Sequence, residues 1–254
     1  MKKFLKSLKP VAIRVVSAAS MLLLIVATLG VSSTLYERYF YGYLGSSVVK
    51  ITKTDKGLSG GTGFVVKAPS GKLYTLTNEH ICSMGDNLVA HTQNGKKHKI
   101  KVIKKYKDHD LCIMEAVPGL RPFKIAKNII LHERVWLIGH PALRPLTLES
   151  GHYVGSFDIK LRSTCPVEVQ KMIKEKYDKG ILTAQELYSI VYTYCTKELE
   201  SQHISNIAYG GNSGSPVVDM FGNVIGVLYA GRRDQPTASH TVPLKEIIKF
   251  LRNK

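Results

Sequence analysis

The pattern of hydrophobic and polar positions changes at about residue 45. Residues 1–14 carry five basic side chains and no acid, and residues 15–36 continue for 22 positions without a charge. A helix needs about 20 apolar residues to cross a bilayer, and a basic segment before it stays in the cytoplasm. The pattern therefore predicts a basic cytoplasmic segment over 1–14, a transmembrane signal anchor over 15–36 and an aromatic, interfacial linker over 37–45.

Two other interpretations of this N-terminal stretch stay open. One is a signal peptide that is removed after export, since small residues from Gly30 to Ser33 offer a weak cleavage site. The other is a helix buried in a protein core, which would leave the basic flank and the following aromatic residues unexplained. The anchor and the signal peptide both imply export. We therefore expect a single-pass membrane protein with a cytoplasmic N-terminus and its bulk on the periplasmic or extracellular side.

Short β-forming runs follow one another from residue 46 onward, separated by Gly, Pro and Asn turns. This spacing is typical of an all-β sandwich or barrel. A closing helix is expected over Leu244–Arg252. The expected strands are Ser47–Ile51, Phe64–Val66, Lys72–Leu76, Asn87–His91, Lys99–Tyr106, Leu111–Glu115, Val135–Ile138, Ser215–Asp219, Val224–Tyr229 and Ser239–Val242.

One segment interrupts the β pattern with two helical periods. Apolar residues fall at helical spacing over 169–173, and a second stripe follows Thr183. Thr183 precedes Glu186 by three positions, which is the spacing of a capping box at the start of a helix. We expect a helical hairpin over Pro166–Ser201, within an insertion of about 163–203.

The chain is strongly basic. Its 254 residues include 36 Lys and Arg against 19 Asp and Glu, a formal charge of +17, and 44% of residues are hydrophobic. These values exclude wholesale disorder and a multi-span membrane protein, and they predict attraction to anionic lipid or cell-wall polymers. Seven lysines between Lys96 and Lys107 fit that role, or simply the solvated face of a strand. The run is poor in aromatic residues, so we expect no nucleic-acid partner.

The sharpest chemical signal is Gly211-Asn212-Ser213-Gly214-Ser215-Pro216. A nucleophilic serine needs a tight turn that exposes its hydroxyl, and flanking glycines permit such a turn. The amides of Gly211 and Ser213 could then point at one place and form an oxyanion hole. Taken alone, the same string also fits an ordinary β-hairpin turn.

Two further residues stand beside expected strands. His80 follows the run 72–76, where it can serve as general base to a serine. Asp110 immediately precedes another strand, where its carboxylate can orient an imidazole and stabilise its charged form; Asp108 is a nearby competitor. The chain order His80, Asp110, Ser213 is one of the known orders of a catalytic triad. We therefore predict His80 as base, Asp110 as orienting acid and Ser213 as nucleophile.

These motifs, in this order, resemble the trypsin-like (chymotrypsin-fold) serine peptidases, most of all their HtrA-type branch. The resemblance extends from Ser46 to Leu251. It implies an all-β fold of two six-stranded barrels with the triad in the cleft between them, and residues 46–254 as a trypsin-like serine protease domain with no PDZ domain after it. The matching stretches are Ser47–Ile51, Gly61–Val66, Leu76–His80, Asp110–Met114, Val135–Pro141, Gly211–Pro216, Val224–Val227 and Val242–Leu244.

The complete expectation for the fold is a two-barrel chymotrypsin-like domain with an inserted helical hairpin, a C-terminal helix and an N-terminal transmembrane helix. The resemblance also implies two walls for the primary substrate pocket. No acid stands in either wall, which favours a small or medium apolar substrate side chain. The walls are Ile207, Ala208 and Tyr209 on one side and Leu228, Tyr229, Ala230 and Gly231 on the other.

Four cysteines allow three full pairings. Cys165 and Cys195 bracket the helical insertion, and an exported location permits a disulfide between them. Cys82 and Cys112 stand two residues after His80 and Asp110, and they fit either a second bond or two small buried hydrophobic side chains. We expect no cofactor and no metal, because the nine histidines and four cysteines show no HExxH or paired-Cys spacing.

The sequence thus predicts a membrane-anchored serine endopeptidase that cleaves protein or peptide substrates through an acyl-enzyme. One alternative is a catalytically silent, membrane-tethered binding module of the same fold. Another is a basic surface-binding protein.

Overall fold

The computed structural model describes residues 38, 40–54, 57, 59–162, 165–231 and 238–252. The chain divides into two units at Gly45 and Ser46. In the first unit the described part forms a short π-helix, η1 (Phe40–Leu44). The predicted cytoplasmic segment and transmembrane anchor (1–14 and 15–36) lie outside the described residues. Within the described part of the chain, no helix is long and apolar enough to span a bilayer.

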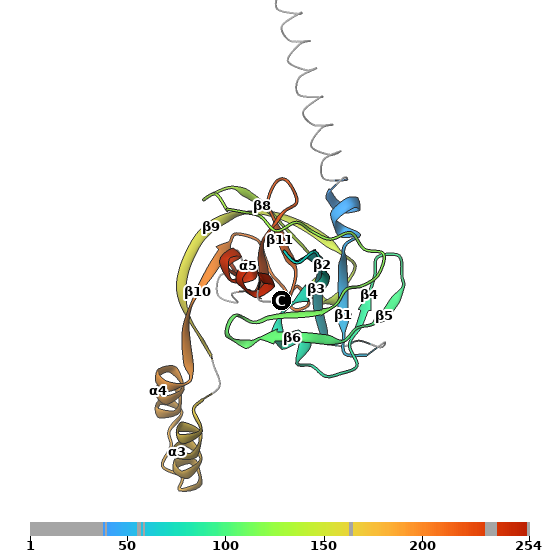
Figure 1. Ribbon diagram of the computed structural model, residues 1–254. Helices are drawn as coiled ribbons and strands as arrows, with labels where there is room; N and C mark the ends of the chain where they lie inside the picture. The colour runs from blue at the N-terminus through green and yellow to red at the C-terminus, as the bar shows by residue number, and fades with distance from the viewer. Residues whose placement is uncertain are drawn as a thin grey trace, which may run out of the picture. The chain divides into compact units, whose positions relative to one another are not determined.

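The second unit begins with a seven-stranded antiparallel sheet in the order β5-β4-β1-β2-β3-β7-β6 (Figure 1). Its middle strand β2 is buried from Gly61 to Val66, because strands on both sides and side chains on both faces cover it. The seven strands are β1 (Val48–Thr52), β2 (Gly60–Lys67), β3 (Leu73–Thr77), β4 (Val89–His91), β5 (Lys97–Lys99), β6 (Val102–Tyr106) and β7 (Leu111–Glu115).

A closed six-stranded barrel follows, in the order β10-β13-β12-β11-β8-β9. Its core contains mainly branched aliphatic side chains such as Val135, Leu137 and Ile225, which suit the crowded inner face of a small barrel. The strands are β8 (Arg134–Gly139), β9 (Thr147–Arg162), β10 (Thr196–Ile204), β11 (Pro216–Val218), β12 (Val224–Gly231) and β13 (Ser239–Val242). Helix α5 (Leu244–Arg252) closes the chain and buries Leu244, Ile247, Phe250 and Leu251.

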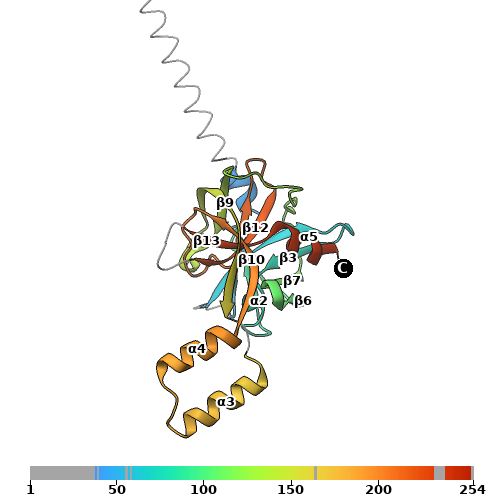
Figure 2. The ribbon, with the colours of Figure 1, turned by 90° about the vertical axis from the view of Figure 1, so that its left-hand side faces the viewer.

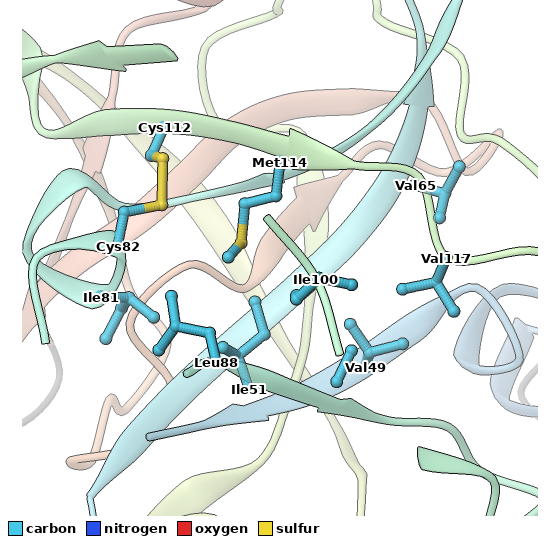
Figure 3. Close-up of a cluster of buried hydrophobic side chains, with 11 residues drawn as sticks. Val49, Ile51, Val65, Ile81, Cys82, Leu88, Ile100, Cys112, Met114 and Val117 are labelled. Atoms are coloured by element: carbon cyan, nitrogen blue, oxygen red, sulfur yellow. A yellow bond between two sulfur atoms is a disulfide. The ribbon is translucent and has the colours of Figure 1, made fainter. Parts of the chain in front are cut away.

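The core of the first sheet is shown in Figure 3. Val49, Ile51 and Val65 meet Met114 and Leu88 there, each at most 1% exposed. A disulfide between Cys82 and Cys112 forms one edge of this cluster. The bond therefore ties the short helix α2 (Glu79–Cys82) to strand β7 through the hydrophobic core.

The expected two-barrel, mostly β architecture is confirmed in its coarse form, with one correction to the first half. The structure has a seven-stranded sheet there, not the implied six-stranded barrel. The expected strand Lys99–Tyr106 is two strands, β5 and β6, because Ile100 turns inward between them and is buried at 4% exposure.

Two helices lie within the segment expected to be helical, α3 (Val167–Asp178) and α4 (Ala184–Tyr194). Thr183 and Glu186 form the predicted capping box. The expected helical range to Ser201 is too long, because residues from Thr196 onward pair with β9 as strand β10. Figures 1 and 2 show the helical hairpin at the far end of the β9–β10 ribbon, and Cys165 and Cys195 form a disulfide at its base.

Candidate active site

His80 and Asp110 are joined by two hydrogen bonds where strand β3 ends and the neighbouring strand β7 begins. His80 stands in α2, directly after β3, and its backbone N–H donates to Asp110 Oδ1 at 2.9 Å. Its ring Nδ1 lies 2.8 Å from Asp110 Oδ2. A carboxylate placed on Nδ1 fixes the ring tautomer, so that Nε2 is left to act as a base. Asp110 is thus a hydrogen-bond partner of His80, and its competitor in the sequence, Asp108, is exposed.

The backbone around Asp110 explains why the carboxylate reaches the imidazole. Asp110 ends a short 3-10 turn, η2 (Lys107–His109), with φ of 50° and ψ of 45°, a left-handed conformation that Asp tolerates better than most residues. The Asn78 side chain donates to the Asp110 carbonyl oxygen at 2.9 Å. The Cys82–Cys112 disulfide joins the same two segments two residues further on. The pair is therefore positioned by a covalent bond and by backbone contacts.

Ser213 lies in a turn that is docked on β2 beside α2. Its carbonyl oxygen accepts a hydrogen bond from the Thr62 N–H at 2.7 Å. A Cβ on Gly61 would lie 2.7 Å from that oxygen and 2.6 Å from the Ile81 side chain, so Ser213 and the residue after His80 crowd the same glycine. Among the described residues no hydrogen bond joins the Ser213 hydroxyl to His80. Such contacts are often long in unliganded enzymes and shorten with substrate.

The glycines on either side of Ser213 have the conformations that the turn requires. Gly211 has φ of +94° and Gly214 has φ of +85°, both in the region that disfavours other residues. A Cβ on Gly211 would also lie 2.5 Å from the His140 carbonyl oxygen. Both positions therefore need glycine, and the chain passes from Gly211 to Ser213 in a tight turn of the kind that an oxyanion hole needs.

Sequence reasoning missed the residue that supports this turn. The buried Thr62 hydroxyl donates to the Gly211 carbonyl oxygen at 2.8 Å and accepts from the His140 N–H at 3.1 Å. Burial lowers the pKa of His140 to about 4, so its ring is neutral at physiological pH. The only signal in the sequence is a hydroxyl between the two glycines of Gly61-Thr62-Gly63.

The two expected walls of the substrate pocket meet at one point. A Cβ on Gly231 would lie 2.8 Å from the Ala208 carbonyl oxygen. Ile207 and Tyr209 are 36% and 55% exposed, whereas Leu228 is 1% exposed and packs in the barrel core. A β-bulge between Leu228 and Ala230 shifts the register, which separates Leu228 from the exposed wall residues.

Tyr229, the residue at this bulge, carries the polar group of the second wall. Its hydroxyl donates to Ser201 Oγ at 2.9 Å. Burial and the negative charge of Asp110 raise the pKa of Tyr229 to about 12, so the phenol stays protonated. His240 pairs with Ala230 across the ladder and stacks edge-on against His203, with ring centroids 4.3 Å apart.

No group of three or more His, Cys, Asp or Glu side chains within the described ranges is arranged to hold a metal ion. The candidate site has the hydrogen-bonded His80–Asp110 pair beside the turn that holds Ser213. Together with a β-sheet domain followed by a β-barrel domain, this arrangement is that of the trypsin-like serine peptidases.

The comparisons with known proteins agree with that class. The model of the trypsin-like peptidase domain matches residues 61–227, and the chain belongs to this family. A mitochondrial Do-like protease 12 of Arabidopsis thaliana is 27% identical over 201 residues, and a PDZ domain-containing protein of Schizosaccharomyces pombe is 24% identical over 216 residues. The alignments cover 76% and 82% of this chain but only 33% and 19% of those longer proteins.

Solved structures share the fold at low identity. The active form of the Rv3671c protease from M. tuberculosis has a TM-score of 0.62 and 19% identity, covering 85% of this chain and 83% of that one. A serine endoprotease from Yersinia pestis has a TM-score of 0.58 and 16% identity, covering 86% and 67% of the two chains. An HtrA-type protease, AlgW, gives 0.58 and 15%, covering 82% and 60%.

Proposed function

We propose that this protein is a serine endopeptidase that acts through His80, Asp110 and Ser213. The observation that carries the proposal is the pair of hydrogen bonds between His80 and Asp110, beside the turn that holds Ser213. A carboxylate on Nδ1 leaves Nε2 of His80 as the base for a hydroxyl delivered from that turn.

In the proposed reaction His80 takes the proton of Ser213 as the hydroxyl oxygen attacks the substrate carbonyl carbon. The N–H groups of Gly211 and Ser213 stabilise the negative oxygen of the tetrahedral intermediate. Protonated His80 then gives its proton to the leaving amine, and an acyl-enzyme remains. Water, activated by His80, hydrolyses the ester and frees Ser213. The reaction needs no cofactor and no metal.

A fluorophosphonate probe tests the nucleophile, because it phosphonylates an activated serine covalently. We expect labelling of the wild-type protein and of Ser189→Ala, which removes an exposed control serine on α4, and no labelling of Ser213→Ala or His80→Ala. Labelling of folded Ser213→Ala would reject the assignment. Folded wild-type protein that takes no label would instead support the alternative, a catalytically silent binding module of the same fold.

The proposed substrates are proteins or peptides with a small or medium apolar side chain before the scissile bond. The absence of acids from the walls Ile207–Tyr209 and Tyr229–Gly231 supports this choice, whereas Leu228, also expected in the second wall, is buried in the barrel core. Apolar pockets separate side chains that differ by one methylene by only about 1–3 kcal/mol, so we expect broad specificity. Cleavage of a peptide library that is confined to Lys, Arg or Glu would contradict it.

We also propose that residues 15–36 anchor the protein in a membrane, with 1–14 in the cytoplasm and 46–254 as the exported protease domain. The uncharged 22-residue run after a basic segment supports this arrangement. The test is carbonate extraction with external protease digestion of sealed cells. Release of the protein by carbonate, or a mature N-terminus after residue 33, would reject the anchor.

A further inference from the structure

A cavity of about 300 Å³ lies between the first sheet and the loop that follows β8. It is lined from β1, from the end of β4 and the turn after it, and from residues 140 and 143–145. The lining includes Lys50, His91, Gln93, His140, Leu143 and Arg144.

The charge of this cavity is positive. Lys50 and Arg144 supply two basic side chains, His91 adds an imidazole ring, and none of the described lining residues is acidic. The Lys50 ammonium donates to the Leu143 carbonyl oxygen at 3.3 Å, a single bond for a group that has three protons to donate. Burial is the main cause of the lowered pKa of His140, and the charges of Lys50 and His91 lower it further.

The hydrogen bonds of the neutral His140 are made with protein groups at the cavity wall. Its Nδ1 lies 2.9 Å from the Arg144 carbonyl oxygen, and its Nε2 lies 3.1 Å from Gln93 Nε2. The ring therefore serves as a fixed wall, and the charged side chains beside it are the groups that a ligand would meet.

The same wall supports the turn that carries Ser213. The Ala142 N–H donates to the Gly210 carbonyl oxygen at 2.5 Å. A Cβ on Gly211 would lie 2.7 Å from the Leu143 nitrogen, so these two segments are in contact. Ala142 and Leu143 have φ of 51° and 58°, a left-handed conformation that costs energy in residues other than glycine and must be maintained by contacts.

We propose that this cavity binds a compact oxyanion, a carboxylate or a phosphate, and that the bound anion steadies residues 141–144 and speeds the acylation of Ser213. The anion pairs with Lys50, which donates to the Leu143 carbonyl oxygen, and with Arg144, which follows Leu143 in the chain. The activity part of the inference rests on the proposed function, whereas the binding part does not.

Binding is measured first, by calorimetry on Ser213→Ala at constant ionic strength, with inorganic phosphate and with acetyl-aspartate amide as probes. We expect saturable binding of at least one probe, which is lost in Lys50→Met and Arg144→Gln. The control, Lys97→Met, removes an exposed lysine of β5 and should bind as the parent does. Binding that is absent, or equal in all variants, overturns the inference. Whether phosphate or the carboxylate binds more tightly identifies the source of the anion.

The rate of fluorophosphonate labelling of the otherwise wild-type protein then measures the coupling. Saturating anion should accelerate it about fivefold, the lower end of usual coupling energies, in the parent and in Lys97→Met but not in Lys50→Met. Saturable binding with an unchanged labelling rate overturns the coupling. Site-specific binding to a protein that never takes the label rejects the proposed function and leaves the anion site in place.

Discussion

We predict that the hydroxyl of Thr62 is needed for fast acylation of Ser213. Thr62→Val keeps the shape of the side chain but removes the acceptor for the His140 N–H and the donor to the Gly211 carbonyl oxygen. Thr62 is 0% exposed, so water does not readily replace either bond. Each partner left unsatisfied costs roughly 1–3 kcal/mol.

The two losses should be felt in different measurements. The loss at His140 lowers the free energy of unfolding by about 1–3 kcal/mol, which urea denaturation measures. The loss at Gly211 falls on the turn that holds the proposed oxyanion donors. A loss of the same size in the transition state lowers the rate of fluorophosphonate labelling roughly 5- to 150-fold, at 1.36 kcal/mol for each factor of ten.

The matched control is Thr62→Ser, which restores the hydroxyl and loses only a methyl group. It should label within about threefold of the wild-type protein, since the turn keeps both hydrogen bonds. Folded Thr62→Val that labels as fast as the wild type would refute the reasoning. So would Thr62→Ser that is as slow as Thr62→Val, because the effect would then come from packing.

Three further predictions concern the pair, its disulfide and the buried imidazole. Asp110→Asn should slow fluorophosphonate labelling about 10⁴-fold at neutral pH without unfolding the protein, because the amide favours the wrong tautomer of His80. A labelling rate reduced by less than tenfold would contradict the proposed role of Asp110. Replacing Cys82 and Cys112 together by Ala should lower the free energy of unfolding by about 3–4 kcal/mol, the value for a closed loop of 30 residues, and an unchanged urea midpoint would show that the bond does not stabilise the fold. Folding lowers the pKa of His140 from 6.5 to about 4. Between these values the imidazole is protonated in the unfolded chain and neutral in the folded chain. The free energy of unfolding therefore falls by about 3 kcal/mol as the pH drops through this window. Urea titrations at about pH 7 and pH 4.5 measure this loss, which should be smaller in His140→Gln.

Short runs of β-forming residues, separated by Gly, Pro and Asn turns, predicted most strands because both signals are local in the sequence. The runs Ser47–Ile51 and Val224–Tyr229 fall close to β1 and β12 for this reason. Periodicity failed where a long-range partner decides the conformation. Residues 196–201 follow a helix without a clear break, and only their pairing with β9 makes them a strand.

The candidate site divides in the same way. His80, Asp110 and Ser213 stand in short motifs beside strands, and such motifs are readable along the chain. Thr62 and Gly211 are separated by 149 positions, and their hydrogen bond exists only once the sheet and the barrel are both folded. The Cys82–Cys112 bond also depends on folding, since the sequence fits two free thiols equally well.

The helical hairpin is attached to the barrel through the β9–β10 ladder, which ends at Arg162 and Thr196. These residues form the last pair of the β9–β10 ladder, and beyond them the segment is closed by its own disulfide. Neither α3 nor α4, as the structure describes them, contributes a buried side chain. A hairpin of another length, or a tight turn, should therefore fit in its place without shifting the register of the ladder.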